Sequence, residues 1–175
     1  MIFTETKLQG SYIIELESIV DERGFFARSF DDKIFTNLGL VSNFVQCNVS
    51  FNEKKGTLRG LHFQEQPFAE DKLVRCTRGK VFEVLVDLRT NSDTYQKWIS
   101  VTLDSKNYKM VYVPKGFALG FQTLENDTEL FYQMSQYYNS DYSKGIRWDD
   151  PSLDIVWPLI PTIISKKDNT LPLLK

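Results

Sequence analysis

The chain has 175 residues, a formal net charge of −2 and a hydrophobic content of 42%. These values are typical of a soluble globular protein, and we expect a single domain over residues 1–175. The absence of a basic excess argues against binding to a nucleic acid backbone. No apolar run approaches the roughly 20 residues that span a bilayer, which argues against a membrane partner.

The N-terminal and cysteine patterns bear on location. The first residues, MIFTETKLQG, lack a basic region followed by an apolar stretch and so do not read as a secretion signal. The two cysteines, Cys47 and Cys76, are too few for a disulfide framework. We therefore expect a cytoplasmic protein. The single histidine, His62, excludes a site built from two or three histidines of this chain, so we expect no metal site.

Most of the chain is predicted to form short strands, because β-branched and aromatic segments alternate with turn residues. One helix is predicted at Asp32–Leu38, with Asp31 or Asp32 as its cap and Gly39 at its end, and a second short helix near Ser105. The candidate strands, in chain order, are Tyr12–Ser18, Phe44–Phe51, Leu58–Gln64, Lys72–Arg78, Val81–Arg89, Lys97–Thr102, Tyr108–Val113, Ala118–Leu124 and Glu129–Tyr138. A tight turn at residues 78–80 makes the fifth strand the predicted hairpin partner of the fourth. This pattern predicts an all-β sandwich or barrel.

The segment Leu58–Gln64 combines polar and apolar residues in a way that bears on function. Period two places His62 and Gln64 on one strand face, and Arg59 and Leu61 on the other. A histidine and a glutamine are costly in a dry core, so they favour a wet pocket inside the barrel. The alternative is a structural His62 with satisfied hydrogen bonds. A bulge at the neighbouring glycine would allow Arg59 to turn toward the face of His62.

Three further polar residues have a structural and a functional interpretation. Lys72 begins a strand, and its side chain either enters a pocket at the strand mouth or lies in water. Tyr132 either fills a core or interface, or donates a proton from a phenol whose ordinary pKa is about 10. Asp168 is a surface or capping residue unless the C-terminal tail folds back onto the barrel. The chain contains no phosphate-binding glycine loop, dinucleotide fingerprint or nucleophile elbow.

Seven motifs, in their order and spacing, resemble the dTDP-4-dehydrorhamnose 3,5-epimerases, a family of cupin-like jelly-roll β-barrels. The motifs are DERGFF (21–26), QCNVS (46–50), LRGLHFQ (58–64), KLVRCTRGKVFEVLVDLR (72–89), VPKGFALGFQ (113–122), GIRWDDP (145–151) and SKKD (165–168). The resemblance implies a barrel with one or two short helices that epimerises C3 and C5 of a nucleotide-linked 4-keto-6-deoxy sugar without a cofactor. Protons on C3 and C5 flank the C4 ketone, so their removal gives an enolate. The reaction needs a base on one face, an acid on the other and a positive group near O4.

The resemblance also implies a role for each site residue. It makes His62 the base, since an imidazole of ordinary pKa is largely neutral at pH 7. It makes Asp168 the carboxylate that orients His62, Tyr132 the acid across the ring, and Lys72 the group that stabilises the enolate oxygen. It implies that Arg59, Gln46 and Asn48 line the site for the sugar and diphosphate, and that Tyr138 stacks on the nucleobase. It also implies that Arg23 and Phe26 of a neighbouring subunit contact the nucleotide. Such a shared site implies a homodimer in which residues 23–28 reach the neighbouring site.

Two residues depart from the family pattern. Leu119, in GFALGF, stands where the family usually has histidine, which indicates either a tolerated packing change or epimerisation at C3 alone. Arg28 stands where many members have a glutamate that reads thymine. A guanidinium donor suits the N3 acceptor of cytosine, which leads to the hypothesis of a CDP-linked substrate. The alternative is that Arg28 turns outward and that stacking alone holds the base.

A function of another class also remains open, namely a barrel that binds a nucleotide sugar without catalysis. The complete set of His62, Lys72, Tyr132 and Asp168 argues against it, because binding needs no base and acid on opposite faces.

Overall fold

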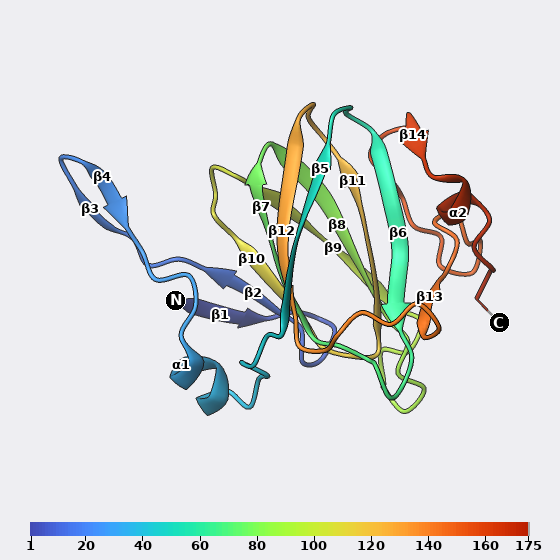
Figure 1. The fold of residues 1–175 in the computed structure, drawn as a ribbon, viewed down its shortest axis with the longest axis horizontal. Helices are drawn as coiled ribbons and strands as arrows, with labels where there is room; N and C mark the ends of the chain where they lie inside the picture. Colours follow the sequence, from blue (N-terminus) through green and yellow to red (C-terminus); the bar gives the residue numbers. More distant parts are fainter. Residues whose placement is uncertain (175) are drawn as a thin grey trace.

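The computed structural model describes residues 1–174 and contains two mainly antiparallel sheets that face each other (Figure 1). The strand order of the first sheet is β1 (Ile2–Glu5), β2 (Tyr12–Glu15), β10 (Met110–Val113), β7 (Lys72–Arg78), β12 (Thr128–Met134) and β5 (Gln46–Asn52). The order of the second sheet is β13 (Ser143–Gly145), β6 (Thr57–Gln64), β11 (Phe117–Thr123), β8 (Lys80–Asp87) and β9 (Trp98–Asp104). The short strand β14 (Ile163–Ile164) pairs with β6 in parallel. This arrangement confirms the predicted all-β, cupin-like jelly roll.

Alternating side chains fill the space between the sheets and cover their outer faces. On β7, Val74 belongs to the interior cluster of apolar residues between the sheets, whereas Leu73 packs on the outer face. On β8, Leu85 lies in the interior cluster and Val84 on the outer face. Both sheets are therefore buried on two sides along part of their length, which explains why their strands are so rich in apolar residues.

The outer faces are covered by segments from the two ends of the chain. The helix α1 (Asp32–Asn37) places Phe35, which is fully buried, against Met110 and Tyr112 of the first sheet. Residues of the C-terminal tail, among them Leu153, pack against Leu61 and Val84 on the second sheet. Burial of each such side chain contributes about 1.5–3 kcal/mol. The tail is thereby held against β6, and it carries the second helix, α2 (Lys166–Asn169).

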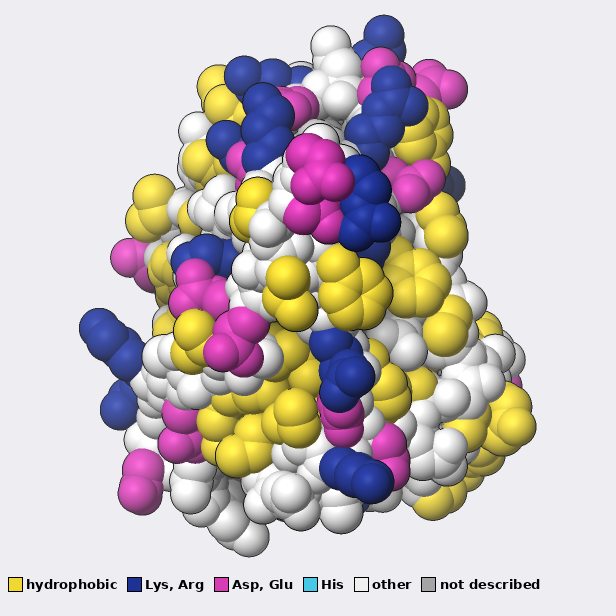
Figure 2. Space-filling view, turned by 90° about the vertical axis from the view of Figure 1, so that its left-hand side faces the viewer, with side chains coloured by type: hydrophobic (Ala, Val, Ile, Leu, Met, Phe, Trp, Pro, Cys, Tyr) yellow, Lys and Arg dark blue, Asp and Glu magenta, His cyan; other side chains and the backbone are white. Residues whose placement is uncertain are grey.

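A hairpin formed by β3 (Ile19–Asp21) and β4 (Gly24–Phe26) projects away from the two sheets (Figure 1). We call residues 19–26 the hairpin arm. Its apolar side chains are largely exposed, and Val20 has a relative exposure of 75%. Figure 2 looks onto the side from which the arm projects and shows hydrophobic side chains gathered among charged ones.

The predicted helix at residues 32–38 is confirmed, with Asp31 as its N-cap and Leu38 as its C-cap. The helix predicted near Ser105 is wrong. Residues 105–107 form a turn in which Asp104 Oδ1 accepts a hydrogen bond from the Lys106 amide at 2.8 Å. The one-turn helix α2 was not predicted as a helix. Neither α1 nor α2 is long and apolar enough to cross a membrane.

Each of the nine predicted strands overlaps an observed one, and the strands β1, β3, β4, β13 and β14 were not predicted. The hairpin pairing predicted between residues 72–78 and 81–89 is wrong, because β7 and β8 lie in different sheets. The predicted turn is present, and Gly79 adopts a positive φ of 74° there. A Cβ at Gly79 would lie 2.5 Å from Thr128 Oγ1, so the chain crosses between the sheets in little space.

Candidate active site

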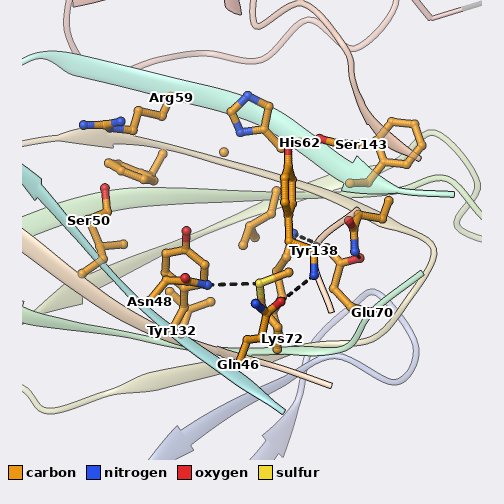
Figure 3. Close-up of a pocket in the computed structure, with 18 of the residues that line it drawn as sticks. Gln46, Asn48, Ser50, Arg59, His62, Glu70, Lys72, Tyr132, Tyr138 and Ser143 are labelled. Atoms are coloured by element: carbon orange, nitrogen blue, oxygen red, sulfur yellow. Dashed lines mark hydrogen bonds and ion pairs between the residues drawn. The ribbon is translucent and has the colours of Figure 1, made fainter. Parts of the chain in front are cut away.

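A cavity of about 480 Å³ lies between the two sheets, a size typical of small-molecule sites. It is lined by residues from both sheets, several of which are drawn in Figure 3. Eight of the predicted site residues line it, namely His62, Lys72, Tyr132, Gln46, Asn48, Arg59, Leu119 and Tyr138. The polar pocket expected inside the barrel is therefore present.

His62 is paired with a carboxylate from the C-terminal tail. The distance between His62 Nε2 and Asp168 Oδ1 is 2.8 Å, and the His62 side chain is 41% exposed whereas Asp168 is buried. The Ser165 hydroxyl caps α2 by accepting from the Asp168 amide, which fixes the carboxylate behind the ring. The tail does fold back onto the barrel, which was the condition for a functional Asp168.

The ionisation of Asp168 decides the tautomer of His62. Burial by itself raises the pKa of Asp168, but hydrogen bonds from His62 and from the Gly60 amide outweigh burial and bring the pKa below its usual value. An ionised carboxylate can only accept, so His62 Nε2–H is the donor. The lone pair of the neutral ring is then on Nδ1, which is the nitrogen left to act as a base.

Arg59 lies on the same side of β6 as His62, against strict alternation. Across the β6–β11 pair, Leu119 is opposite His62 but Phe121 is opposite Arg59, so two residues of β6 face the single residue Gly120. This is the β-bulge that the sequence allowed. Arg59 is then held by Asn52, whose Oδ1 accepts from Arg59 Nε at 2.7 Å.

Glycines at the bulge permit a close approach of β6 and β11. A Cβ at Gly60, whose φ is +113°, would lie 2.6 Å from the Cα of Gly120. A Cβ at Gly120 would lie 2.9 Å from the Arg59 carbonyl oxygen. Neither position has room for a side chain without movement of backbone.

Tyr132 faces His62 from the opposite sheet. It projects from β12 of the first sheet, whereas His62 projects from β6 of the second, and Figure 3 shows the two on opposite walls of the pocket. Burial raises the pKa of Tyr132, and nearby Arg59 offsets part of that rise. The phenol is therefore protonated at neutral pH and available as a proton donor.

Lys72 enters the pocket rather than the solvent. Its side chain is 12% exposed, and Nζ lies 2.8 Å from Glu70 Oε1. The other oxygen of Glu70 accepts from Gln64 Nε2 at 3.0 Å. The ammonium group is thus held in the pocket that His62 and Tyr132 also line. Such a pocket has the groups needed to take a proton from one face of a substrate, return one to the other face and stabilise a developing negative charge.

Several pocket residues were missed by sequence reasoning. They are Ser50, Glu70, Glu83, Ser143 and Lys167. The sequence could have indicated Glu83 as a candidate, since it is the one charged residue in the apolar run VFEVLV. Lys167 and Ser143 reach the pocket through folding of the C-terminal third, which no local pattern reveals.

Three predicted substrate-binding residues do not line this cavity. Arg23 and Phe26 lie on the hairpin arm and are exposed. Arg28 follows the arm, and its Nη1 is 2.7 Å from Oδ2 of Asp31. The structure therefore does not bring these three residues to the site of their own chain.

Comparison with known proteins agrees with this geometry. The family model described as dTDP-4-dehydrorhamnose 3,5-epimerase matches residues 5–175. The chain belongs to this family. The family member from Methanothermobacter thermautotrophicus is 47% identical over 170 residues, which cover 95% of this chain and 90% of the relative.

Two solved structures of family members superimpose closely. The Bacillus anthracis enzyme, solved with TDP and pyrophosphate bound, has a TM-score of 0.95 at 41% identity and covers 99% of both chains. The Legionella pneumophila enzyme, solved in complex with dTDP-4-keto-L-rhamnose, has a TM-score of 0.92 at 39% identity, covering 98% of this chain and 92% of the other.

Proposed function

We propose that the chain is an isomerase that inverts C3 and C5 of a dTDP-linked 4-keto-6-deoxyhexose. The observation that carries this proposal is the placement of the His62–Asp168 pair and Tyr132 on opposite walls of one pocket, which Lys72, on the strand beside that of Tyr132, also lines. A pocket that only binds a sugar nucleotide has no need of a base and an acid on opposing faces.

The proposed reaction uses each of these groups once per inverted centre. His62 Nδ1 takes the proton from the carbon beside the ketone, and the C–H electron pair moves into the enolate. Lys72 Nζ stabilises the charge on O4, and Tyr132 delivers a proton to the opposite face of the same carbon. Asp168 stabilises the imidazolium that forms. Before the next centre reacts, the imidazolium releases its proton to solvent and solvent returns a proton to Tyr132.

The nucleotide is proposed to be dTDP. The TDP and dTDP-sugar bound to the two related structures support this choice, and Tyr138, which is 56% exposed at the pocket, offers a face for the base. A CDP-linked substrate is also tested, because the guanidinium of Arg28 could donate to the N3 acceptor of cytosine. Its ion pair with Asp31 fits the alternative in which it does not read the base.

A homodimer completes the proposed site. The hairpin arm carries Arg23 and Phe26 away from their own pocket, and it exposes apolar side chains that a partner would cover. The edge strand β5 beside the pocket also exposes Val49 and Phe51. We propose that the arm of one copy extends to the pocket of the other, where Arg23 contacts the nucleotide.

Leu119 raises the alternative of epimerisation at C3 alone. It lines the pocket next to His62, as the residue of β11 paired with it, and cannot donate a hydrogen bond or a proton. The proposed double epimerisation therefore relies on Tyr132 at both carbons.

Incubation with dTDP- and CDP-4-keto-6-deoxyglucose in D₂O, followed by proton NMR, tests the proposal. We expect deuterium at both C3 and C5, with faster exchange of the dTDP substrate. Deuterium at C3 alone would show that the chain epimerises C3 only. Faster exchange of the CDP substrate would indicate that Arg28 recognises the nucleobase. No deuterium with either substrate would favour a barrel that binds a nucleotide sugar without catalysis.

A further inference from the structure

Glu83 is a carboxyl group in the apolar wall of the pocket. It projects from the middle of β8 between Val81 and Leu85, which both belong to the interior cluster. In the sheet it is opposite Phe121 of β11 on one side and Val101 of β9 on the other. Its relative exposure is 1%, yet it lines the cavity.

The Glu83 carboxyl has no hydrogen-bond or ion-pair partner among residues 1–174, and its Oε2 is fully buried. The other buried carboxyls of the site differ, because Glu70 is held by Lys72 and Gln64, and Asp168 by His62. An unsatisfied carboxyl in an apolar wall is costly and rare in native proteins. Its position at the pocket points to a partner on the substrate.

The surroundings of Glu83 favour its neutral form. Burial raises the pKa of Glu83 to about 8, although the charge of Lys72 on β7 lowers it in part. The other charged or titratable groups that line the pocket are Tyr132 and Glu70 on the side of the first sheet, Arg59 and His62 on β6 of its own sheet, and Lys167 on α2. At pH 7 the group is therefore mainly a carboxylic acid, which can donate a hydrogen bond.

We propose that Glu83 is a further catalytic residue, a neutral carboxylic acid that donates a hydrogen bond to the C4 oxygen of the sugar beside Lys72. This inference rests on the proposed function. The proton stays on Glu83 throughout, while the carbon-bound proton goes to His62 and the electron pair to O4. An apolar site can keep a carboxylic acid neutral for this purpose in an enolate-forming isomerase.

The charge balance around Lys72 supports this role. Glu70 already forms an ion pair with Lys72 at 2.8 Å. A second ionised carboxylate nearby would cancel the field that stabilises the enolate, whereas a neutral acid adds a second donor without that penalty. Two fixed donors stabilise a developing oxyanion more strongly than one.

Two substitutions separate a neutral donor from a carboxylate. Glu83→Gln keeps a neutral donor, and Glu83→Met removes it at similar volume. Rates of deuterium exchange at C3 and C5 are measured from pH 6 to 9.5, together with the Kd for dTDP. Glu129→Gln is the matched control, because Glu129 is also a strand carboxyl but bonds Thr77 outside the pocket.

We expect Glu83→Met to lose about 10²–10³-fold in exchange at neutral pH, as for other oxyanion donors, with the Kd for dTDP unchanged. Glu83→Gln retains exchange within about tenfold of wild type and lacks the decline that wild type shows as Glu83 ionises above about pH 8. Equal losses in Glu83→Gln and Glu83→Met would overturn the proposal, as would unchanged exchange in Glu83→Met.

A direct measurement covers the case in which Glu83→Met does not fold. The ¹³C chemical shift of the Glu83 carboxyl, assigned with Glu83→Gln, is expected to report a protonated acid at pH 7, and an ionised group there would overturn the inference. Failure of the proposed function is distinct, since wild type would then exchange neither carbon of any 4-keto sugar nucleotide tested.

Discussion

Asp168 Oδ1 accepts a hydrogen bond from His62 Nε2 at 2.8 Å, although 106 positions separate the two residues in the chain. The contact exists because β14 pairs with the start of β6 and so draws the tail along the strand that bears His62. The C-terminal tail is therefore part of the candidate site and not only a cover for the outer face of the sheet.

Replacement of Asp168 by asparagine is expected to slow exchange at C3 and C5 by about 10²–10⁴-fold, the usual range for loss of acid–base function. The amide is similar in size but carries no charge to stabilise the imidazolium of His62. Exchange into the substrate in D₂O measures the effect, and dTDP affinity should be unchanged. Lys166→Ala, on an exposed position of the same helix, is the control. Wild-type exchange in Asp168→Asn would remove this residue from the mechanism.

The bulge in β6 predicts a severe effect of Gly60→Ala. A Cβ there would lie 2.6 Å from backbone of Gly120, so β6 and β11 must separate and move His62 and Arg59. We expect a loss of about 3 kcal/mol or more in the free energy of unfolding, measured with urea. Gly39→Ala is the matched control, because Gly39 also has a positive φ but open space around it, and about 1 kcal/mol is expected there. Similar losses in the two variants would show that the close strand approach is not important.

Because the pKa of Glu83 is raised in the folded protein, we expect the free energy of unfolding to depend on pH, and this can be measured without substrate. Its pKa rises from 4.5 to about 8 in the folded protein, so between these values the folded state binds more protons than the unfolded state. The free energy of unfolding of wild type, relative to Glu83→Gln, should therefore fall as pH rises through this interval, by at most about 1.4 kcal/mol per pH unit. Urea unfolding from pH 5 to 9 measures it, and parallel curves for the two proteins would contradict a neutral Glu83.

The hairpin arm predicts that assembly and activity are linked. Val20→Glu places a charge on the exposed apolar surface of the arm and is expected to prevent the proposed dimer from forming, leaving a monomer with strongly reduced exchange. Sedimentation velocity measures the mass. Ile160→Glu is the control, since Ile160 is an equally apolar side chain with 90% exposure outside the arm. A Val20→Glu protein that remains dimeric, or a monomer with full activity, would argue against a shared site.

The sequence predicted those parts of the fold that depend on local patterns. Periodicity and turn residues located the barrel strands, and Asp31 with Gly39 bounded the helix α1 closely. Local patterns could not show which sheet a strand belongs to. The turn sequence at Gly79 would be the same whether it connected two paired strands or two strands in different sheets. The predicted pairing of β7 with β8 failed for that reason.

The site residues also divide into those that the sequence predicted and those that only tertiary packing reveals. The resemblance and the polar residues of LRGLHFQ predicted a pocket lined by His62, and the bulge at Gly60 resolved how Arg59 joins it. Glu70 and Lys167 were missed because tertiary packing, not strand period, brings them to the cavity. Burial also decides the charge state of Glu83, and burial is a property of the folded protein.

We propose that His62 is the base that faces Tyr132 across the pocket. It is tested most directly by comparing His62→Asn with wild type in D₂O on dTDP-4-keto-6-deoxyglucose, with dTDP binding measured in parallel. We expect deuterium at C3 and C5 with wild type. In His62→Asn we expect exchange lowered by about 10²–10⁴-fold at both carbons, while dTDP still binds. Undiminished exchange in His62→Asn would contradict it.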